Sequence, residues 1–281
     1  MQVSLLRPFF RQFALTLFVS LIAGTVFAQA QPAKKKDEFQ PYSGQEGKDV
    51  VWVPTSQALV NKMLDMAKVT PNDLVMDLGS GDGRTVITAA KRGAKAIGVE
   101  FNPDMVALSR RNAQKEGVTE KAQFVHGDIF ETDFSKATVI TLFLLPELNV
   151  KLRPKILGMK PGTRVVSNSF TMGEWTADQT QNVSEKEGCT AYCTAYLWIV
   201  PAKVEGKWQL PGGELALKQN FQMVTGTLGA NAISNGAIRA DQINFTAGGA
   251  QYSGKVSGDT ITGTVKTGDK SSNFTATRVG A

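Results

Sequence analysis

One segment constrains the fold of this chain more than any other: the run Asp77-Leu78-Gly79-Ser80-Gly81-Asp82-Gly83. It follows a short apolar stretch, Leu74 to Asp77, that predicts a β-strand, and it precedes residues 84–92, which predict a helix. Glycine is needed where the backbone turns sharply and where a ligand must approach without a Cβ in the way. The segment therefore predicts a strand–loop–helix unit whose loop binds a ligand.

The spacing of the glycines narrows the class of ligand. Dinucleotide sites follow the pattern Gly-x-Gly-x-x-Gly and bind a pyrophosphate at the helix N-terminus. Here the third glycine, Gly83, comes one residue early, and two acids, Asp77 and Asp82, flank the loop. Carboxylates repel a pyrophosphate but suit a cofactor that carries an ammonium and a sulfonium. The loop, with Gly79, Ser80 and Gly81 at its centre, therefore favours S-adenosyl-L-methionine over a nicotinamide cofactor.

Two further acids follow the next two predicted strands. Glu100 ends the strand predicted at residues 96–100, where an acid can accept hydrogen bonds from both ribose hydroxyls. Asn102, just beyond it, is included in the expected cofactor site. Asp128 follows the strand predicted at residues 122–125 and can accept a hydrogen bond from the adenine amino group, with Ile129 packing on the ring. Acids at the carboxyl ends of adjacent parallel strands converge on one ligand site in an open α/β sheet.

Short β-rich runs alternate with helical stretches between residues 51 and 202. This alternation predicts a Rossmann-like, doubly wound α/β sheet. Residues 203–281 are rich in Gly, Thr, Ser and Asn, with Gly-Asp and Gly-Gly turns between short alternating runs, and predict a small antiparallel β-rich domain, either a meander or a small barrel. Two similar segments within it, residues 224–228 and 261–265, are explained either by a faint internal duplication or by the biased composition of Thr- and Gly-rich hairpins, and we favour the latter.

The chain resembles a known enzyme family. The glycine loop, Glu100 and Gly127-Asp128 are similar to the motifs of the seven-stranded class I S-adenosylmethionine-dependent methyltransferases. A narrower resemblance spans residues 51–175, and the segments that carry it are Val53-Pro54-Thr55, Glu100-Phe101-Asn102-Pro103, Leu144-Leu145-Pro146-Glu147 and Lys160-Pro161-Gly162. They resemble the lysine methyltransferases of mitochondria that modify the c subunit of ATP synthase and the adenine nucleotide translocase, together with their bacterial relatives.

This resemblance implies a methyl transfer to a lysine amine of a protein, with membrane-associated proteins among the expected substrates. We expect Glu147 to orient the acceptor and Phe143 to form part of the channel wall, because both follow the fourth strand, at the rim where acceptors enter in this fold. An acid in the first turn of a helix is equally well explained by the helix dipole. Asn168 and Phe170, beyond the fifth strand, are weaker candidates, and Trp175 is expected to be a packing residue.

The N-terminal region predicts export. Residues 1–30 contain a basic start with Arg7 and Arg11, an apolar stretch at residues 13–23 and the cleavage pattern Ala28-Gln29-Ala30, as in a signal peptide. Residues 31–50 have no apolar periodicity and predict a linker. We expect a periplasmic or extracellular protein, the alternative being a membrane anchor formed by an uncleaved N-terminal segment.

Composition sets further bounds on function. The net charge of +6 is mild and forms no basic stripe, so nucleic-acid binding is not expected. The two cysteines, Cys189 and Cys193, have no nearby histidine to complete a metal site. They can form a disulfide only if the chain turns between them, since four extended residues span about 13 Å. No Gly-x-Ser-x-Gly motif supports a hydrolase. The remaining alternative to an enzyme is an exported cofactor-binding scaffold without turnover.

Overall fold

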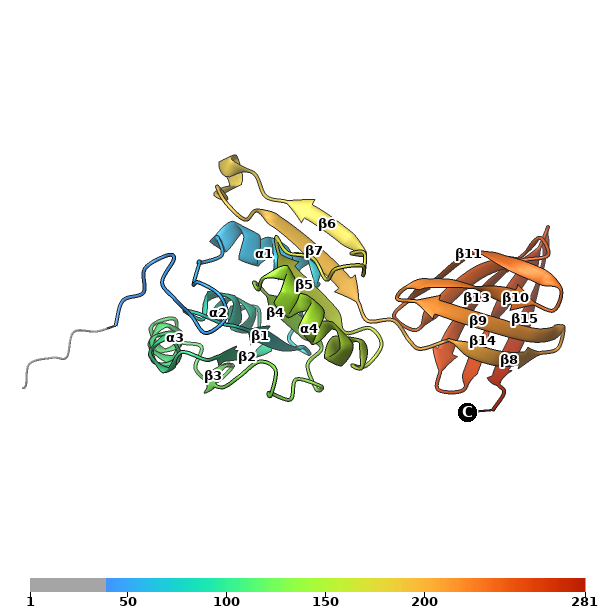
Figure 1. Ribbon diagram of the computed structural model, residues 1–281, viewed down its shortest axis with the longest axis horizontal. Helices are drawn as coiled ribbons and strands as arrows, with labels where there is room; N and C mark the ends of the chain where they lie inside the picture. The colour runs from blue at the N-terminus through green and yellow to red at the C-terminus, as the bar shows by residue number, and fades with distance from the viewer. Residues whose placement is uncertain (1–38, 281) are drawn as a thin grey trace, which may run out of the picture. The chain divides into compact units, whose positions relative to one another are not determined.

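The computed structural model describes residues 39–280. The predicted signal peptide, residues 1–30, and the first part of the predicted linker lie outside the described residues. The described chain contains an α/β part followed along the sequence by a closed β-barrel (Figure 1). None of the helices in residues 39–280 is both long and apolar enough to cross a membrane.

The α/β part is built on one seven-stranded sheet with the order β3-β2-β1-β4-β5-β7-β6. Strands β1 to β5 pair in parallel, whereas β7 runs antiparallel to both of its neighbours. The strands are β1 (Leu74–Leu78), β2 (Lys95–Glu100), β3 (Ala122–His126), β4 (Val139–Leu142), β5 (Arg164–Asn168), β6 (Gln179–Asn182) and β7 (Thr194–Ile199). The predicted doubly wound α/β sheet is therefore confirmed.

Helices cover both faces of this sheet, as Figure 1 shows. The helices are α1 (Gln57–Met66), α2 (Arg84–Lys91), α3 (Pro103–Lys115), α4 (Pro146–Leu157) and the short 3₁₀ helix η1 (Glu185–Glu187). Buried residues of α1, α2 and α3 form one core with one face of the sheet, and α4 packs in a second core on the opposite face. Neighbouring residues of β1 show this division, because Val75 belongs to the first core and Met76 to the second.

Local signals in the sequence explain where the helices begin. The side chain of Ser56 accepts a hydrogen bond from the Leu59 N–H at 3.2 Å and so caps α1. Asn102 caps α3 in the same way by accepting from the Asp104 N–H at 2.9 Å, and Pro103 occupies the first turn. The sequence does not predict β6, because its four residues, Gln-Thr-Gln-Asn, form a mostly exposed edge strand without an apolar face.

The C-terminal part is a closed antiparallel barrel of eight strands joined by two-residue turns. Its strands are β8 (Gly206–Leu210), β9 (Gly213–Asn220), β10 (Met223–Leu228), β11 (Asn231–Arg239), β12 (Gln242–Ala247), β13 (Ala250–Ser257), β14 (Thr260–Thr267) and β15 (Lys270–Arg278). Each strand pairs with the next along the chain, and β15 pairs with β8 to close the ring. Of the two predicted architectures, the structure shows the barrel, filled by its own core around the fully buried Trp208.

The two similar segments of the barrel place their glycines in the same kind of position. A Cβ on Gly226 would lie 1.9 Å from the Ala216 carbonyl oxygen, and a Cβ on Gly263 would lie 2.0 Å from the Ser253 carbonyl oxygen. In both cases the neighbouring strand leaves no room for a side chain. Glycine at these positions therefore allows the strands to approach closely where the barrel curves.

Cys189 and Cys193 form a disulfide whose Cα atoms lie 5.7 Å apart. The chain bends at Ala191 and Tyr192 between them, and the backbone of Tyr192 is in the left-handed region with a φ of 55°. The bend supplies the turn that the sequence requires for a bridge between residues four apart. The loop between β6 and β7 is therefore cross-linked just before β7 begins.

Candidate active site

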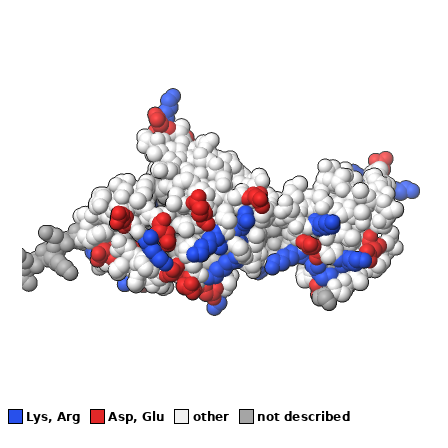
Figure 2. Space-filling model, in the orientation of Figure 1, with Lys and Arg blue, Asp and Glu red and all other residues white. Residues whose placement is uncertain are grey.

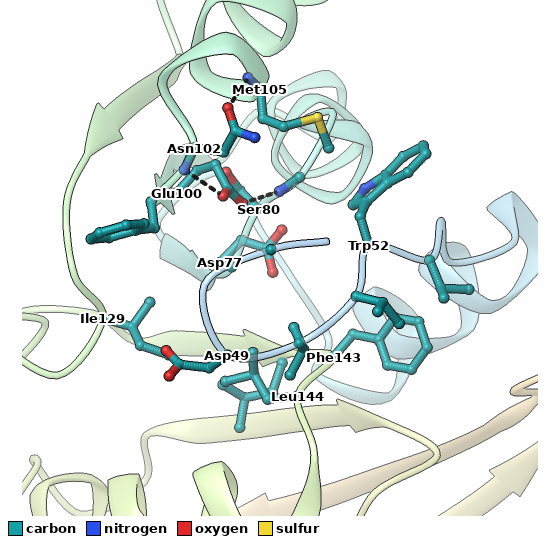
Figure 3. A pocket seen from close by; sticks show the side chains of 18 of the residues that line it. Asp49, Trp52, Asp77, Ser80, Glu100, Asn102, Met105, Ile129, Phe143 and Leu144 are labelled. Carbon is teal, nitrogen blue, oxygen red and sulfur yellow. Dashed lines mark hydrogen bonds between the residues drawn. The ribbon is translucent and has the colours of Figure 1, made fainter. Parts of the chain in front are cut away.

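A single cavity lies at the carboxyl ends of the central strands. Its volume is ≈ 410 Å³, within the range of small-molecule sites. It is lined by the glycine loop after β1, by residues that follow β2 to β5, by Tyr192 before β7, and by residues 45–55 of the N-terminal segment. Figure 3 shows the side chains of Asp77, Ile129 and Phe143 around this one space.

The glycine loop has the backbone geometry that the sequence predicts. Gly79 and Gly81 have positive φ values of 86° and 53°, and the Gly79 and Ser80 N–H groups donate to the Val99 carbonyl of β2. A Cβ on Gly81 would lie 2.5 Å from the indole nitrogen of Trp52, so this glycine keeps the cavity wall open. The hydroxyl of Ser80 is buried and has no hydrogen-bond partner among the described residues. It is therefore a free polar group beside the loop.

Gly83 serves a different purpose from the other two glycines. It caps α2 with a φ of 84° and is not among the residues that line the cavity. A Cβ here would lie 2.6 Å from Ser109 Cβ and 2.7 Å from the ring of Phe124. Of the predicted cofactor-binding residues, Gly83 is the one that the structure places in helix packing, where it brings α2 close to α3 and β3.

Asp77 is the most perturbed acid of the site. It is the penultimate residue of β1 and its side chain is buried, and the hydroxyl of Thr141 donates a hydrogen bond to it at 2.5 Å. The pKa of Asp77 is raised to about 7, mainly by burial and also by the negative charges of Glu100 and Asp82, while the Thr141 hydrogen bond opposes the rise. A cationic ligand beside this carboxyl would favour its ionised form.

Glu100 is held rigidly at the end of β2. One carboxylate oxygen accepts a hydrogen bond from the Gly81 N–H at 2.9 Å, and the other accepts from the Asn102 N–H at 2.9 Å. Each carboxylate oxygen has a second lone pair that these bonds leave unused. Glu100 is therefore preorganised to accept two more hydrogen bonds, which matches its predicted role toward two vicinal hydroxyls (Figure 3).

The other two predicted acids carry partners of their own. Asp82 forms an ion pair with Arg84 at 2.6 Å, and Arg84 also donates to the Thr55 carbonyl at 2.7 Å. The two acids flanking the loop are thus not equivalent, because the charge of Asp82 is offset by Arg84. Asp128 pairs with Lys48, and this ion pair, together with the Phe130 N–H, lowers the pKa of Asp128.

Residues 45–55, which we call the strap, form a wall of the cavity that motif reasoning missed. The Trp52 N–H donates to the Gln45 carbonyl at 2.8 Å and closes the strap into a loop, and Gln45 is buried. The ammonium of Lys48 lies 4.6 Å from the centre of the Phe101 ring. Residues 45–50 belong to the predicted linker, and their polar, glycine-containing composition carries no signal for this packing. Within the strap, the segment that the sequence singles out is Val53-Pro54-Thr55, through the family resemblance.

Three aromatic rings line the end of the cavity beyond β4 and β5. The ring centres of Phe143 and Phe170 are 6.0 Å apart, and that of Tyr192 is 5.3 Å from Phe143 and 6.0 Å from Phe170. Phe143 therefore lies where the sequence predicts a channel wall. Glu147, in contrast, is exposed in the first turn of α4 and is not among the lining residues, a position that suits the helix dipole. Its role in orienting the acceptor remains a prediction.

Of the weaker candidates, neither Asn168 nor Trp175 lines the cavity. Asn168 is fully buried and donates to the hydroxyl of Thr55 at 3.1 Å, so it ties the end of β5 to the strap. Trp175 is fully buried in the core on the α4 face, as expected of a packing residue.

The cavity is acidic. Six of the residues that line it are acidic and two are basic, and both basic residues, Lys48 and Arg84, are paired with acids. Over residues 51–202 as a whole, 17 basic side chains face 16 acidic ones. On the face that Figure 2 shows, basic and acidic side chains are interspersed. The negative charge thus belongs to the cavity and not to this part of the chain in general, and it favours a cationic ligand.

Comparison with known proteins bears on the family. The model of the ANTKMT methyltransferase domain matches residues 77–179. A protein-lysine N-methyltransferase of Saccharolobus islandicus is 44% identical over 154 residues, which are 54% of this chain and 94% of that protein. The chain belongs to the ANTKMT methyltransferase family. A lysine N-methyltransferase of Rattus norvegicus, named for the c subunit of ATP synthase, is 36% identical over 130 residues, and the chain spans 60% of its length.

A solved structure identifies the cofactor of a relative. The crystal structure of an RNA methyltransferase from Salinibacter ruber in complex with S-adenosyl-L-homocysteine is 45% identical, covers 54% of this chain and 96% of its own, and has a TM-score of 0.50. The present chain is accordingly an S-adenosylmethionine-dependent methyltransferase. These relatives are named for different acceptors, however, since two are protein-lysine methyltransferases and the third is an RNA methyltransferase.

The residues present fit this cofactor. Asp77 would face the ammonium, Glu100 would accept from the ribose hydroxyls, and Asp128 with Ile129 would hold the adenine. The wall left open at Gly81 provides space along the loop. When bound, the cofactor supplies a methyl group already activated by its sulfonium.

Proposed function

We propose that this methyltransferase transfers its methyl group to the ε-amine of a lysine in a protein substrate. The observation that carries the proposal is the pairing of an acidic cavity with an aromatic wall at the acceptor end. A lysine side chain is a cation on a long apolar stem, so it matches both features. The lysine methyltransferases of Saccharolobus islandicus and Rattus norvegicus support the same acceptor.

The chain's own residues account for the steps that such a transfer requires. Methyl transfer is an in-line displacement, so the protein mainly positions the two reactants. A lysine ammonium must lose a proton before it can attack, and desolvation between Phe143, Phe170 and Tyr192 lowers its pKa. Figure 3 shows Asp49 of the strap between Ile129 and Leu144, where its carboxylate adds to the acidic lining of the cavity. The strap also excludes water from the cavity.

RNA is the second candidate acceptor, because the protein from Salinibacter ruber is named an RNA methyltransferase. The charge of the site argues against RNA for this chain. A phosphate backbone is bound mainly through Lys and Arg, and the cavity offers only two basic residues, both paired. A cofactor-binding scaffold without turnover is not supported either, since the relatives are named as enzymes.

A methyl-transfer assay tests the acceptor. The purified protein is incubated with tritiated S-adenosylmethionine and, separately, with a cell-envelope protein extract, with the same extract after acetylation of its lysines, and with total RNA. We expect label in the untreated protein extract alone, and methyl-lysine in the labelled protein by mass spectrometry. Glu100→Ala, which removes the predicted ribose contact, should lose the labelling. Label in RNA, or equal label in acetylated protein, would contradict the proposal.

We further propose that the protein is exported and acts in an oxidising compartment. The signal-peptide pattern of residues 1–30 and the disulfide between Cys189 and Cys193 support this location, because disulfides persist mainly outside the cytoplasm. The mass of the mature protein isolated from cells tests it, with cleavage expected after Ala30. A full-length mass in the membrane fraction would favour the uncleaved anchor, and a full-length mass in the cytoplasm would refute export.

A further inference from the structure

The aromatic wall at the acceptor end combines three segments that are distant in sequence. Phe143 follows β4, Phe170 follows β5, and Tyr192 precedes β7. The rings of Phe143 and Phe170 are nearly parallel, with an angle of 22° between their planes, whereas Tyr192 meets Phe143 edge-on at 62°. All three residues line the cavity. Together they form a concave aromatic surface with one wall, Tyr192, contributed by the loop that the disulfide closes.

The aromatic surface and the predicted cofactor contacts are positioned by different strands of the sheet. The acids that would hold the cofactor lie at the carboxyl ends of β1, β2 and β3, whereas the aromatic residues follow β4 and β5 and precede β7. The order β3-β2-β1-β4-β5-β7 therefore separates a cofactor half of the cavity from an aromatic half. An aromatic half within an acidic cavity suits an ammonium group, because aromatic faces attract cations.

Apart from the ring contacts of Tyr192 with Phe143 and Phe170, the main restraint on this residue is the disulfide. The backbone of Tyr192 has a φ of 55°, which is unfavourable for a bulky residue. Within the described residues, Thr190, Ala191 and Tyr192 take part in no backbone-to-backbone hydrogen bond. Its side chain is 45% exposed, so packing alone does not lock it. A short segment of this kind would sample many conformations without a cross-link.

The two cysteines at either side of this segment are themselves anchored. Cys189 is 1% exposed and packs in the core shared with α1 and α2. Cys193 precedes β7, and its carbonyl accepts a hydrogen bond from the Val183 N–H at 2.9 Å. The bridge thus ties the loop to the core on one side and to the sheet on the other. The one large side chain between the two anchors is Tyr192.

We propose that Tyr192 is a specificity-determining residue that contacts the acceptor ammonium, and that Cys189 and Cys193 are positioning residues whose bridge holds it there. The proposal rests on the proposed lysine acceptor and names the part of the site that recognises it. The acceptor half of the cavity is complete only when the bridge is formed. Cofactor binding, which uses residues after β1 to β3, does not depend on the bridge.

Binding of a small probe tests this assignment without turnover. The mature protein is saturated with S-adenosyl-L-homocysteine and titrated, by NMR, with N-acetyl-trimethyllysine methylamide and with its neutral carbon isostere, in which the quaternary nitrogen is replaced by carbon. The wild-type protein should bind the charged probe roughly fivefold or more tighter than the neutral one, as a cation–π contribution predicts. Equal binding of the two probes would overturn the proposal.

Variants separate the ring from the bridge. Tyr192→Leu, which keeps the bridge, and Cys189→Ser/Cys193→Ser, which keeps the tyrosine, should each remove most of the preference for the charged probe. Tyr192→Phe should retain it. The variant that combines Tyr192→Leu with Cys189→Ser/Cys193→Ser should lose no more of the preference for the charged probe than either variant alone, because both changes act on one contact. Tyr42→Leu is the matched control, since Tyr42 is 69% exposed and outside the cavity, and should change nothing.

The affinity for S-adenosylmethionine, measured by calorimetry on the same variants, should stay within twofold of wild type. If the bridge-free variant loses cofactor binding or folding as well, or if Tyr192→Leu binds the charged probe as wild type does, the proposal is wrong. The result is independent of the acceptor assay. Charge-selective binding without lysine methylation would refute the proposed function alone, and lysine methylation without charge-selective binding would refute this inference alone.

Discussion

At Asp77, burial and ligand binding act in opposite directions on one carboxyl group. Burial raises its pKa to about 7, so without cofactor the group is largely protonated below that pH. A cofactor ammonium beside it favours the ionised form, so binding must release the proton when the pH is below 7. The affinity of this site for its cofactor is therefore coupled to pH through a single residue.

We expect the dissociation constant for S-adenosylmethionine to fall about tenfold between pH 5.5 and pH 7.0, a range in which an α-amino group stays protonated. Asp77→Asn should bind more weakly at pH 7.0 and show a nearly flat profile over the same range. Calorimetry at four pH values measures both proteins. A wild-type profile as flat as that of the variant would show that Asp77 does not titrate on binding.

The same shift has a consequence for stability. The pKa of Asp77 is higher in the folded protein than in the unfolded chain, so this group favours the folded state at low pH and loses that contribution as the pH rises toward 7. Without cofactor, the melting temperature of the wild-type protein should therefore fall relative to that of Asp77→Asn between pH 4.5 and pH 7.5. Thermal denaturation followed by circular dichroism measures the difference, and parallel curves would contradict it.

Glu100 provides a second prediction at this scale. It accepts hydrogen bonds from the Gly81 and Asn102 N–H groups and has capacity for two more. Hydrogen bonds to a charged group contribute about 1.5–3 kcal/mol each. The loss of two in Glu100→Ala should therefore weaken cofactor binding by roughly 100-fold or more. Ser56→Ala is the control, because it removes a helix cap outside the cavity and should cost about 1 kcal/mol of stability with no change in affinity. Equal affinities of the two variants would contradict the role of Glu100.

At the scale of elements, the position of α2 depends on Gly83. The helix begins at a residue with a φ of 84° whose missing side chain lets Ser109 and Phe124 approach. Gly117 offers a matched comparison, since it has a φ of 67° but no atom within 4 Å of the position of a Cβ. The two glycines thus share the backbone requirement, and only Gly83 adds a packing requirement.

We expect Gly117→Ala to lower the free energy of unfolding by about 1 kcal/mol, the cost of left-handed backbone for an L-residue. Gly83→Ala should lower it by a further 1–3 kcal/mol or so, since overpacking adds to the strain. Urea denaturation of both variants measures the difference. If the two losses are equal, packing at Gly83 is not the reason for glycine there.

At the scale of the whole molecule, the cavity and the barrel draw on separate stretches of chain. The residues that line the cavity lie between 45 and 192, whereas the buried residues of the barrel core lie between 202 and 276. A protein that ends at residue 202 should therefore bind S-adenosylmethionine within twofold of the full-length affinity. Calorimetry on the truncated and full-length proteins tests this, and a tenfold loss would show that the barrel supports the site.

Local patterns were sufficient to predict the α/β sheet and the turn after β1. Strand–helix alternation, the caps at Ser56 and Asn102 and the glycine spacing each act within a few residues, so each is visible in sequence. The edge strand β6 could not be predicted, because it has no buried face and therefore no alternation of apolar and polar residues. The sequence left the choice between a meander and a closed barrel open, because the pairing of β15 with β8 joins segments that no local signal relates.

For the site, the sequence by itself determined which acid lies near the carboxyl end of which strand: Asp77 in β1, Glu100 in β2 and Asp128 just beyond β3. The tertiary structure decided everything that depends on contact between distant segments. It placed Lys48 on Asp128, paired Asp82 with Arg84, left Glu147 outside the cavity and brought Tyr192 to Phe143. The physical reason is that the order of the strands fixes which residues stand at the carboxyl edge of the sheet. The partner of each side chain, in contrast, depends on packing across the whole fold.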